Sequence, residues 1–145
     1  MTTVPESDDT LRYLGGALIL VVGAIHLQQY LDFINDVPTI GELFLLNAAG
    51  AGAIAVMLAT RPRSLAALSG IALSAGALVS IVIALLSSLF DYSEPSLRFP
   101  IVLAIVAEAA AVLVLTAYLS RARSARRAGQ APHAAGRAPA GTRSG

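Results

Sequence analysis

Four side chains capable of polar chemistry lie inside the apolar stretches of this sequence. Glu108 is the only Asp, Glu, Lys or Arg within 13–31, 43–60, 64–90 and 99–120, and it is accompanied by His26, Asn47 and Ser80. An acid in hydrocarbon costs roughly 2.5–3.5 kcal/mol on insertion scales and generally marks a functional site. Glu108 and His26 are therefore candidates for proton exchange or ligand binding, with Asn47 and Ser80 as hydrogen-bonding groups beside them.

Each of the two ionisable candidates also has a structural interpretation. Burial disfavours the charged form of Glu108, and a neutral carboxyl that hydrogen-bonds Asn47 or a serine would simply hold helices together. His26 precedes Gln29 and Tyr30, so it could be a hydrated histidine at a membrane interface. Both interpretations stay open at the level of the sequence.

Several cofactor and activity classes are disfavoured by composition. The chain has no Cys, which excludes thiolate catalysis and Cys-held metal clusters. Its membrane part has a single His, so a bis-histidine haem would require a dimer, and no ligand pair has helical spacing for a metal. No phosphate loop, nucleophile elbow, zinc helix or nucleic-acid platform is present. We predict no metal site and no nucleic-acid partner, assign no cofactor, and favour a non-enzymatic protein.

The apolar stretches themselves predict the fold. Hydrophobic residues make up 56% of the chain and charged residues 13%, against about 25% charged in a typical soluble domain. A helix needs about 20 apolar residues to cross a bilayer, and four segments qualify. We place them at about 11–31, 40–60, 64–90 and 97–120. Because their connections are short, we predict an all-α polytopic membrane protein, an antiparallel four-helix transmembrane bundle spanning 11–120.

The four candidates should lie in one layer of that bundle. At about 1.5 Å per residue, His26, Asn47, Ser80 and Glu108 lie roughly 8–15 Å from the ends of their helices on one side of the membrane. Each helix contributes one of them. Glu42 is set apart, because Thr39-Ile40-Gly41-Glu42 has the pattern of a capping box that would begin the second helix.

Arginine placement predicts the orientation of the bundle. The connection at 61–63 has two Arg and no acid, and four Arg follow the last span between 121 and 127. The connections at 32–38 and 91–98 carry four acids and one Arg. The positive-inside rule therefore puts both termini in the cytoplasm. We predict a multi-pass protein of the bacterial inner (plasma) membrane, with a cytoplasmic segment at 1–10 and a disordered basic cytoplasmic tail at 121–145.

One part of the sequence resembles known proteins. The stretch His26-Leu27, Tyr30 and Pro38-Thr39-Ile40-Gly41-Glu42-Leu43-Phe44-Leu45-Leu46-Asn47 is similar to a segment of small uncharacterised integral membrane proteins of high-GC Gram-positive bacteria. It covers the first two spans and implies no assigned activity. In size and number of spans the chain also resembles DoxX-like four-helix proteins, a likeness that implies the fold and no quinone chemistry.

Three hypotheses for function follow. The first is a binding, transport-accessory or interaction subunit with a polar intramembrane pocket centred on Glu108, His26 and Asn47. The second is a membrane oxidoreductase component that binds quinone or haem. The third is a structural partner within a larger membrane complex. In each case the lipid bilayer is the main surrounding, and a homo-oligomer or a larger assembly would supply further contacts.

Overall fold

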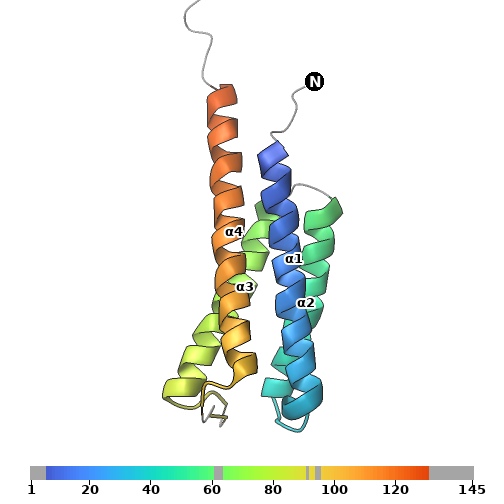
Figure 1. Cartoon of the computed structure of the whole chain (residues 1–145), viewed down its shortest axis with the longest axis vertical. Helices are drawn as coiled ribbons and strands as arrows, with labels where there is room; N and C mark the ends of the chain where they lie inside the picture. The colour runs from blue at the N-terminus through green and yellow to red at the C-terminus, as the bar shows by residue number, and fades with distance from the viewer. Residues whose placement is uncertain (1–5, 61–63, 91, 94–95, 131–145) are drawn as a thin grey trace, which may run out of the picture.

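The chain is a bundle of four helices that run alternately up and down (Figure 1). The computed structural model describes residues 6–60, 64–90, 92–93 and 96–130. Its elements are α1 (Glu6–Gln29), a π-helical turn η1 (Tyr30–Ile34), α2 (Ile40–Thr60), α3 (Ser64–Leu86) and α4 (Phe99–Gln130). Four helices, α1 taken together with η1, are long and apolar enough to cross a membrane. The predicted all-α four-helix fold is confirmed.

Small residues let the helices approach closely. A Cβ added to Gly23 of α1 would lie 2.8 Å from the Cβ of Ala51 in α2, so the two backbones are nearly in contact there. Around this contact the core is aliphatic, with Ile19, Leu58 and Leu115 fully buried. Close packing of this kind holds helices together in lipid, where the hydrophobic effect gives no preference for helix–helix contact.

The turn between α1 and α2 differs from the predicted capping box. Asn35 donates its N–H to Tyr30 O at 3.0 Å, which closes the wide π turn at the end of the first span. Thr39 has a φ of 64°, whereas a capping residue has extended backbone. Backbone hydrogen bonds connect the first turn of α2 to the residues before it instead, including one from Gly41 N–H to Val37 O at 2.9 Å. Glu42 is exposed.

Helix ends differ from several predicted boundaries. α4 continues to Gln130, so the predicted disorder from 121 onward is wrong for 121–130, where Ala and Arg are strong helix formers. α1 already begins at Glu6, so the second half of the predicted separate segment at 1–10 is part of that helix, and residues 1–5 lie outside the described residues. α3 ends at Leu86 and not at residue 90, since a short backbone pairing of Leu89 with Tyr92 replaces its last turn. Residues 131–145 lie outside the described residues.

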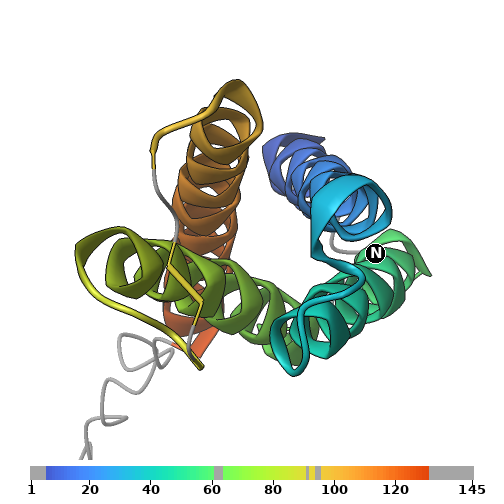
Figure 2. The same ribbon diagram turned by 90° about the horizontal axis from the view of Figure 1, so that it is seen from below.

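The two helical hairpins, α1–α2 and α3–α4, spread apart toward one end of the molecule. In Figure 1 the lower ends of α3 and α4 lie to the left of those of α1 and α2, and Figure 2 shows this end from below. The helix-connecting segments 30–39 and 87–98 are located here, and we call it the loop end. At the opposite end lie the start of α1 and the end of α4 (Figure 1).

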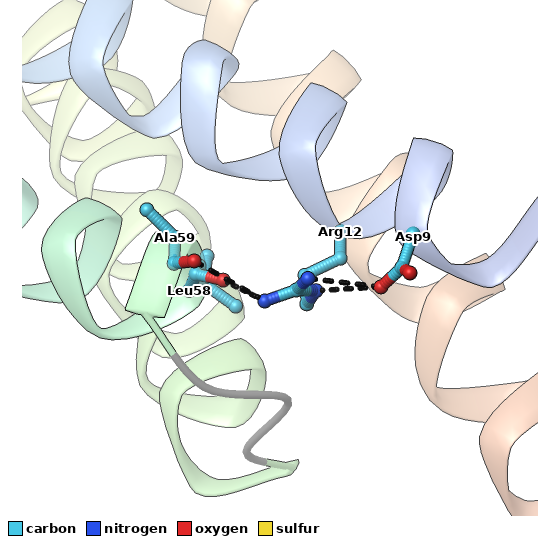
Figure 3. Close-up of polar contacts among 4 residues, drawn as sticks. All are labelled: Asp9, Arg12, Leu58 and Ala59. Atoms are coloured by element: carbon cyan, nitrogen blue, oxygen red, sulfur yellow. Dashed lines mark hydrogen bonds and ion pairs between the residues drawn. The ribbon is translucent and has the colours of Figure 1, made fainter. Parts of the chain in front are cut away.

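A buried arginine joins α1 to α2 at that opposite end. Arg12, only 6% exposed, donates from Nη1 to Leu58 O at 2.7 Å and to Ala59 O at 3.4 Å, and it pairs with Asp9 at 2.9 Å (Figure 3). The two carbonyls belong to the last turn of α2, where backbone acceptors lack partners within the helix and a cation is favourable. Arg12, which the sequence indicates only as a charge at the edge of a span, thus stabilises the bundle.

Candidate functional site

Glu108 and His26 meet across the contact between α1 and α4. Glu108 is fully buried and His26 is 6% exposed, and His26 Nε2 lies 3.7 Å from Glu108 Oε1. That distance suits an ion pair and is too long for a hydrogen bond. Within the described chain, both Glu108 oxygens are buried without a hydrogen-bond partner. The predicted packing bond from Glu108 to Asn47 or a serine is therefore not formed, and His26 is its polar neighbour.

The second ring nitrogen of His26 shows where the imidazole proton lies. Nδ1 is 3.0 Å from Val22 O, and a carbonyl can only accept, so Nδ1 carries a hydrogen. In a neutral ring Nε2 is then an acceptor facing Glu108. The two favourable arrangements are a carboxylic acid facing neutral imidazole and a carboxylate facing imidazolium. In both, the pair shares one proton and has no net charge.

His26 also forms part of the wall of a cavity at the loop end. The cavity has a volume of about 400 Å³ and lies between the two hairpins, bounded by α1, α2, α3, the start of α4 and both connecting segments. That volume falls in the range of small-molecule sites, roughly 300–1,000 Å³. Aliphatic side chains form most of the wall. The polar residues that line it are His26, Gln29, Asn47, Ser80 and Tyr92.

The ring of His26 has its two nitrogens toward Val22 O and Glu108. It lies beside the Phe44 ring, with centroids 4.9 Å apart and planes tilted by 47°. Glu108 itself does not line the cavity, whereas Ala104, one turn earlier in α4, does. Glu108 is therefore located behind the wall, in contact with it through His26.

Two amide side chains are the polar groups best placed to receive a ligand. Asn47 Oδ1 is buried without a hydrogen-bond partner among the described residues. Gln29 is 8% exposed and lies one turn from His26 on α1. Both line the cavity. Because a buried amide without a partner is costly, a molecule that pairs with these groups would gain binding free energy there.

The remaining candidate, Ser80, lies on the cavity wall, but its hydroxyl already makes a hydrogen bond within the protein. Its hydroxyl donates to Gly76 O at 2.9 Å, in its own helix, and retains acceptor capacity. The structure thus brings His26, Asn47 and Ser80 to one cavity and connects Glu108 to it through His26. Of the four residues that the sequence predicts in one layer, three line the cavity and Glu108 lies behind its wall.

Three polar residues on or near the site were not among the sequence candidates: Gln29, Ser74 and Tyr92. Gln29 could have been found, since it follows His26 by three residues and so shares its helix face. Ser74 is fully buried with its hydroxyl unpartnered in the described part of the chain. Nothing in its apolar surroundings distinguishes Ser74 from the other serines of that span.

The donor set argues against a haem site and offers no metal site. Within residues 6–60, 64–90, 92–93 and 96–130, no three His, Cys, Asp or Glu side chains are grouped to hold an ion. An axial haem ligand needs a free imidazole nitrogen. His26 has one nitrogen on a carbonyl and the other facing a carboxyl. The arrangement is suited instead to hydrogen bonding, apolar contact and the holding of one proton.

Comparisons with protein-family models, curated proteins and solved structures gave no match to this chain.

Proposed function

We propose that this protein binds a small, mostly apolar molecule in the cavity between its two hairpins. The observation that carries the proposal is an unpartnered, buried amide oxygen of Asn47 in the wall of a cavity that is otherwise largely aliphatic. Ligand pockets have this composition, with a few convergent polar groups that orient the bound molecule. The protein would act as a binding or transport-accessory subunit, and its activity would follow from what it binds.

The proposed setting is the inner membrane of a bacterium, with both termini in the cytoplasm. Support comes from the four arginines between 121 and 127, at the end of α4 opposite the loop end, and from the two arginines at 61–63, which the sequence places between α2 and α3. In this orientation the cavity lies in the outer half of the bilayer. A lipophilic molecule could reach it from the lipid or from the outer surface.

A variant that fills the cavity tests the proposal. Gly76 lines the cavity, and a Cβ added there meets no atom within 4 Å, so Gly76→Leu should occupy the space without disturbing the fold. Gly52→Leu is the matched control, because Gly52 is equally open and lies outside the cavity wall. Both changes raise helix propensity alike.

The measurement is mass spectrometry of organic extracts from the three proteins, purified in the same detergent. We expect a lipophilic compound that co-purifies with the wild type and with Gly52→Leu and is lost from Gly76→Leu. Identical extracts from all three proteins would contradict binding in this cavity.

A second candidate function is that of an oxidoreductase component, favoured by the His26–Glu108 pair. The pair holds one proton, and His26 lies on the cavity wall. The pair could therefore supply that proton to a bound quinone whose two electrons come from a separate reductase partner. A quinone in the extract of the wild type but not of Gly76→Leu would favour this function. Glu108→Gln should then abolish quinone reduction and leave quinone binding intact.

A further inference from the structure

The charge of the cavity wall defines the ligand class more narrowly. No Asp, Glu, Lys or Arg among the described residues lines the cavity. Glu42 of α2 is exposed, and α3 has no charged residue between Ser64 and Leu86. Glu108, which lies one turn from the lining residue Ala104, faces His26 and is neutralised by it. A ligand would thus find no counter-charge in the described wall.

An ion placed in such a site loses its hydration without compensation, which is far more costly than the burial of an uncharged polar group. The available polar partners are instead two amides. Each amide both donates and accepts hydrogen bonds, so Gln29 and Asn47 are complementary to a headgroup with carbonyl, amide or hydroxyl groups. An amide can pair with such a group in either orientation of its own O and N atoms.

The composition of the wall suits a ligand that has one polar end. Gln29 and Asn47 come from α1 and α2, whereas α3 and α4 supply mostly aliphatic residues, among them Leu73, Ile81 and Ile101. Ser80 of α3 and Tyr92 are the polar residues described on that side, and the Ser80 hydroxyl already donates to Gly76 O. The His26 and Phe44 rings lie on the amide side. An uncharged headgroup on the amides would leave its hydrocarbon portion against α3 and α4.

We infer that the ligand is an uncharged amphiphile, whose headgroup hydrogen-bonds Asn47 and Gln29 and whose apolar portion packs between the hairpins. The inference rests on the proposed binding function and adds the chemical class of the ligand. It separates this cavity from sites for fatty-acid anions, cationic amphiphiles and inorganic ions.

Three probes of equal chain length and different charge test it at pH 7. They are decanamide, decanoate and decylammonium, added to the full-length protein in nanodiscs of uncharged lipid. The readout is the melting temperature of wild type, Gly76→Leu and Gly52→Leu, because a ligand of the folded state raises it. Subtraction of the change in melting temperature of Gly76→Leu from that of the wild type removes the effect of probe dissolved in the bilayer.

We expect decanamide to raise the melting temperature of wild type and Gly52→Leu by about 3 °C or more near saturation, with no rise in Gly76→Leu. Decanoate and decylammonium should give no rise that depends on Gly76. Leu is similar in size to Asn. Asn47→Leu should therefore raise the decanamide concentration needed for a given rise in melting temperature at least tenfold, which corresponds to the loss of roughly one buried hydrogen bond.

A Gly76-dependent rise with either ionic probe as large as that with decanamide would overturn the inference while leaving cavity binding in place. No Gly76-dependent rise with decanamide would also overturn it, whatever the ionic probes do. The proposed function fails separately, if the extracts of wild type and Gly76→Leu are the same and no probe of any charge distinguishes the two proteins.

Discussion

His26 Nε2 lies 3.7 Å from Glu108 Oε1 across the α1–α4 contact, and both side chains are buried. Since Nδ1 of His26 donates to Val22 O, the pair shares a single proton. This relationship turns two groups that are individually costly in an apolar interior into one neutral unit. It also leaves the wall formed by the described residues without a charge, on which the proposed ligand class depends.

Removal of either member of the pair should destabilise the fold. Glu108→Leu and His26→Leu should each lower the free energy of unfolding by about 1–3 kcal/mol, because each removes the polar neighbour that the other buried ionisable group faces. The double variant should be less damaging than the sum of the two, by about 1–2 kcal/mol. Reversible unfolding in mixed micelles measures these values. Additive losses would show that the two side chains do not interact.

Glu108→Gln separates the structural role of the acid from its proton. An amide can still donate toward Nε2 of neutral His26, so stability should stay within about 0.5 kcal/mol of the wild type. Infrared spectroscopy of both proteins would follow the carboxyl directly. The band of the Glu108 side chain, either the carbonyl stretch of a protonated acid or a carboxylate band, should disappear in Glu108→Gln. A decrease of several kcal/mol in the free energy of unfolding of that variant would contradict a neutral, paired Glu108.

Arg12 should contribute to stability much more than the other arginines at its end of the bundle. Arg12→Leu removes the charged hydrogen bond to Leu58 O and should cost about 2 kcal/mol. Arg121→Leu is the control, since Arg121 is exposed and the structure gives it no comparable contact. Equal melting temperatures for the two variants would mean that the carbonyls at the end of α2 do not need Arg12.

The close approach of α1 and α2 predicts opposite effects for two glycines in one helix. A methyl group at Gly23 would lie 2.8 Å from Ala51 Cβ, whereas at Gly16 its nearest neighbour would be Leu58 Cβ at 3.7 Å. Gly16→Ala should be neutral or stabilising by up to about 1 kcal/mol. Gly23→Ala should be about 1–3 kcal/mol less stable than Gly16→Ala. The same denaturation assay compares them, and equal stabilities would show that the helices are not closely packed at Gly23.

The sequence predicts the four helices well because lipid imposes a simple rule. An uninterrupted apolar stretch of sufficient length is a strong signal, and the charged residues at 91–98 separate the third span from the fourth, although α3 already ends at Leu86. Depth along a helix is also predictable, since the rise per residue is fixed. The shared layer of His26, Asn47, Ser80 and Glu108 follows from that rise.

Rotation of the helices is what the sequence does not determine. Whether Glu108 meets His26 or Asn47 depends on which faces of α1, α2 and α4 contact each other, and the small residues are spread over several faces. The burial of Arg12 depends on the end of α2, which is distant in the chain. The length of α4 depends on helix propensity in a polar segment, a signal that charge and composition obscure.

Cysteine labelling tests the proposed orientation, since the chain contains no Cys. Asn35→Cys and Ser96→Cys place thiols at exposed positions of the loop end, and Ser124→Cys places one on the exposed end of α4. An impermeant maleimide added to intact cells should label the first two and should label Ser124→Cys only after permeabilisation. The reverse pattern would show that the termini are outside.

The side-chain amides of Asn47 and Gln29 give the most direct test of ligand binding in the cavity. Nitrogen-15 NMR of the protein in nanodiscs, titrated with decanamide, should show saturable shifts of both amides. Asn35 and Gln28, which are exposed, are internal controls and should not follow the same curve. Saturation at Asn47 and Gln29 alone, absent in Gly76→Leu, is the predicted result. Unchanged Asn47 and Gln29 resonances, or parallel shifts of all four amides, would contradict a ligand seated between the two hairpins.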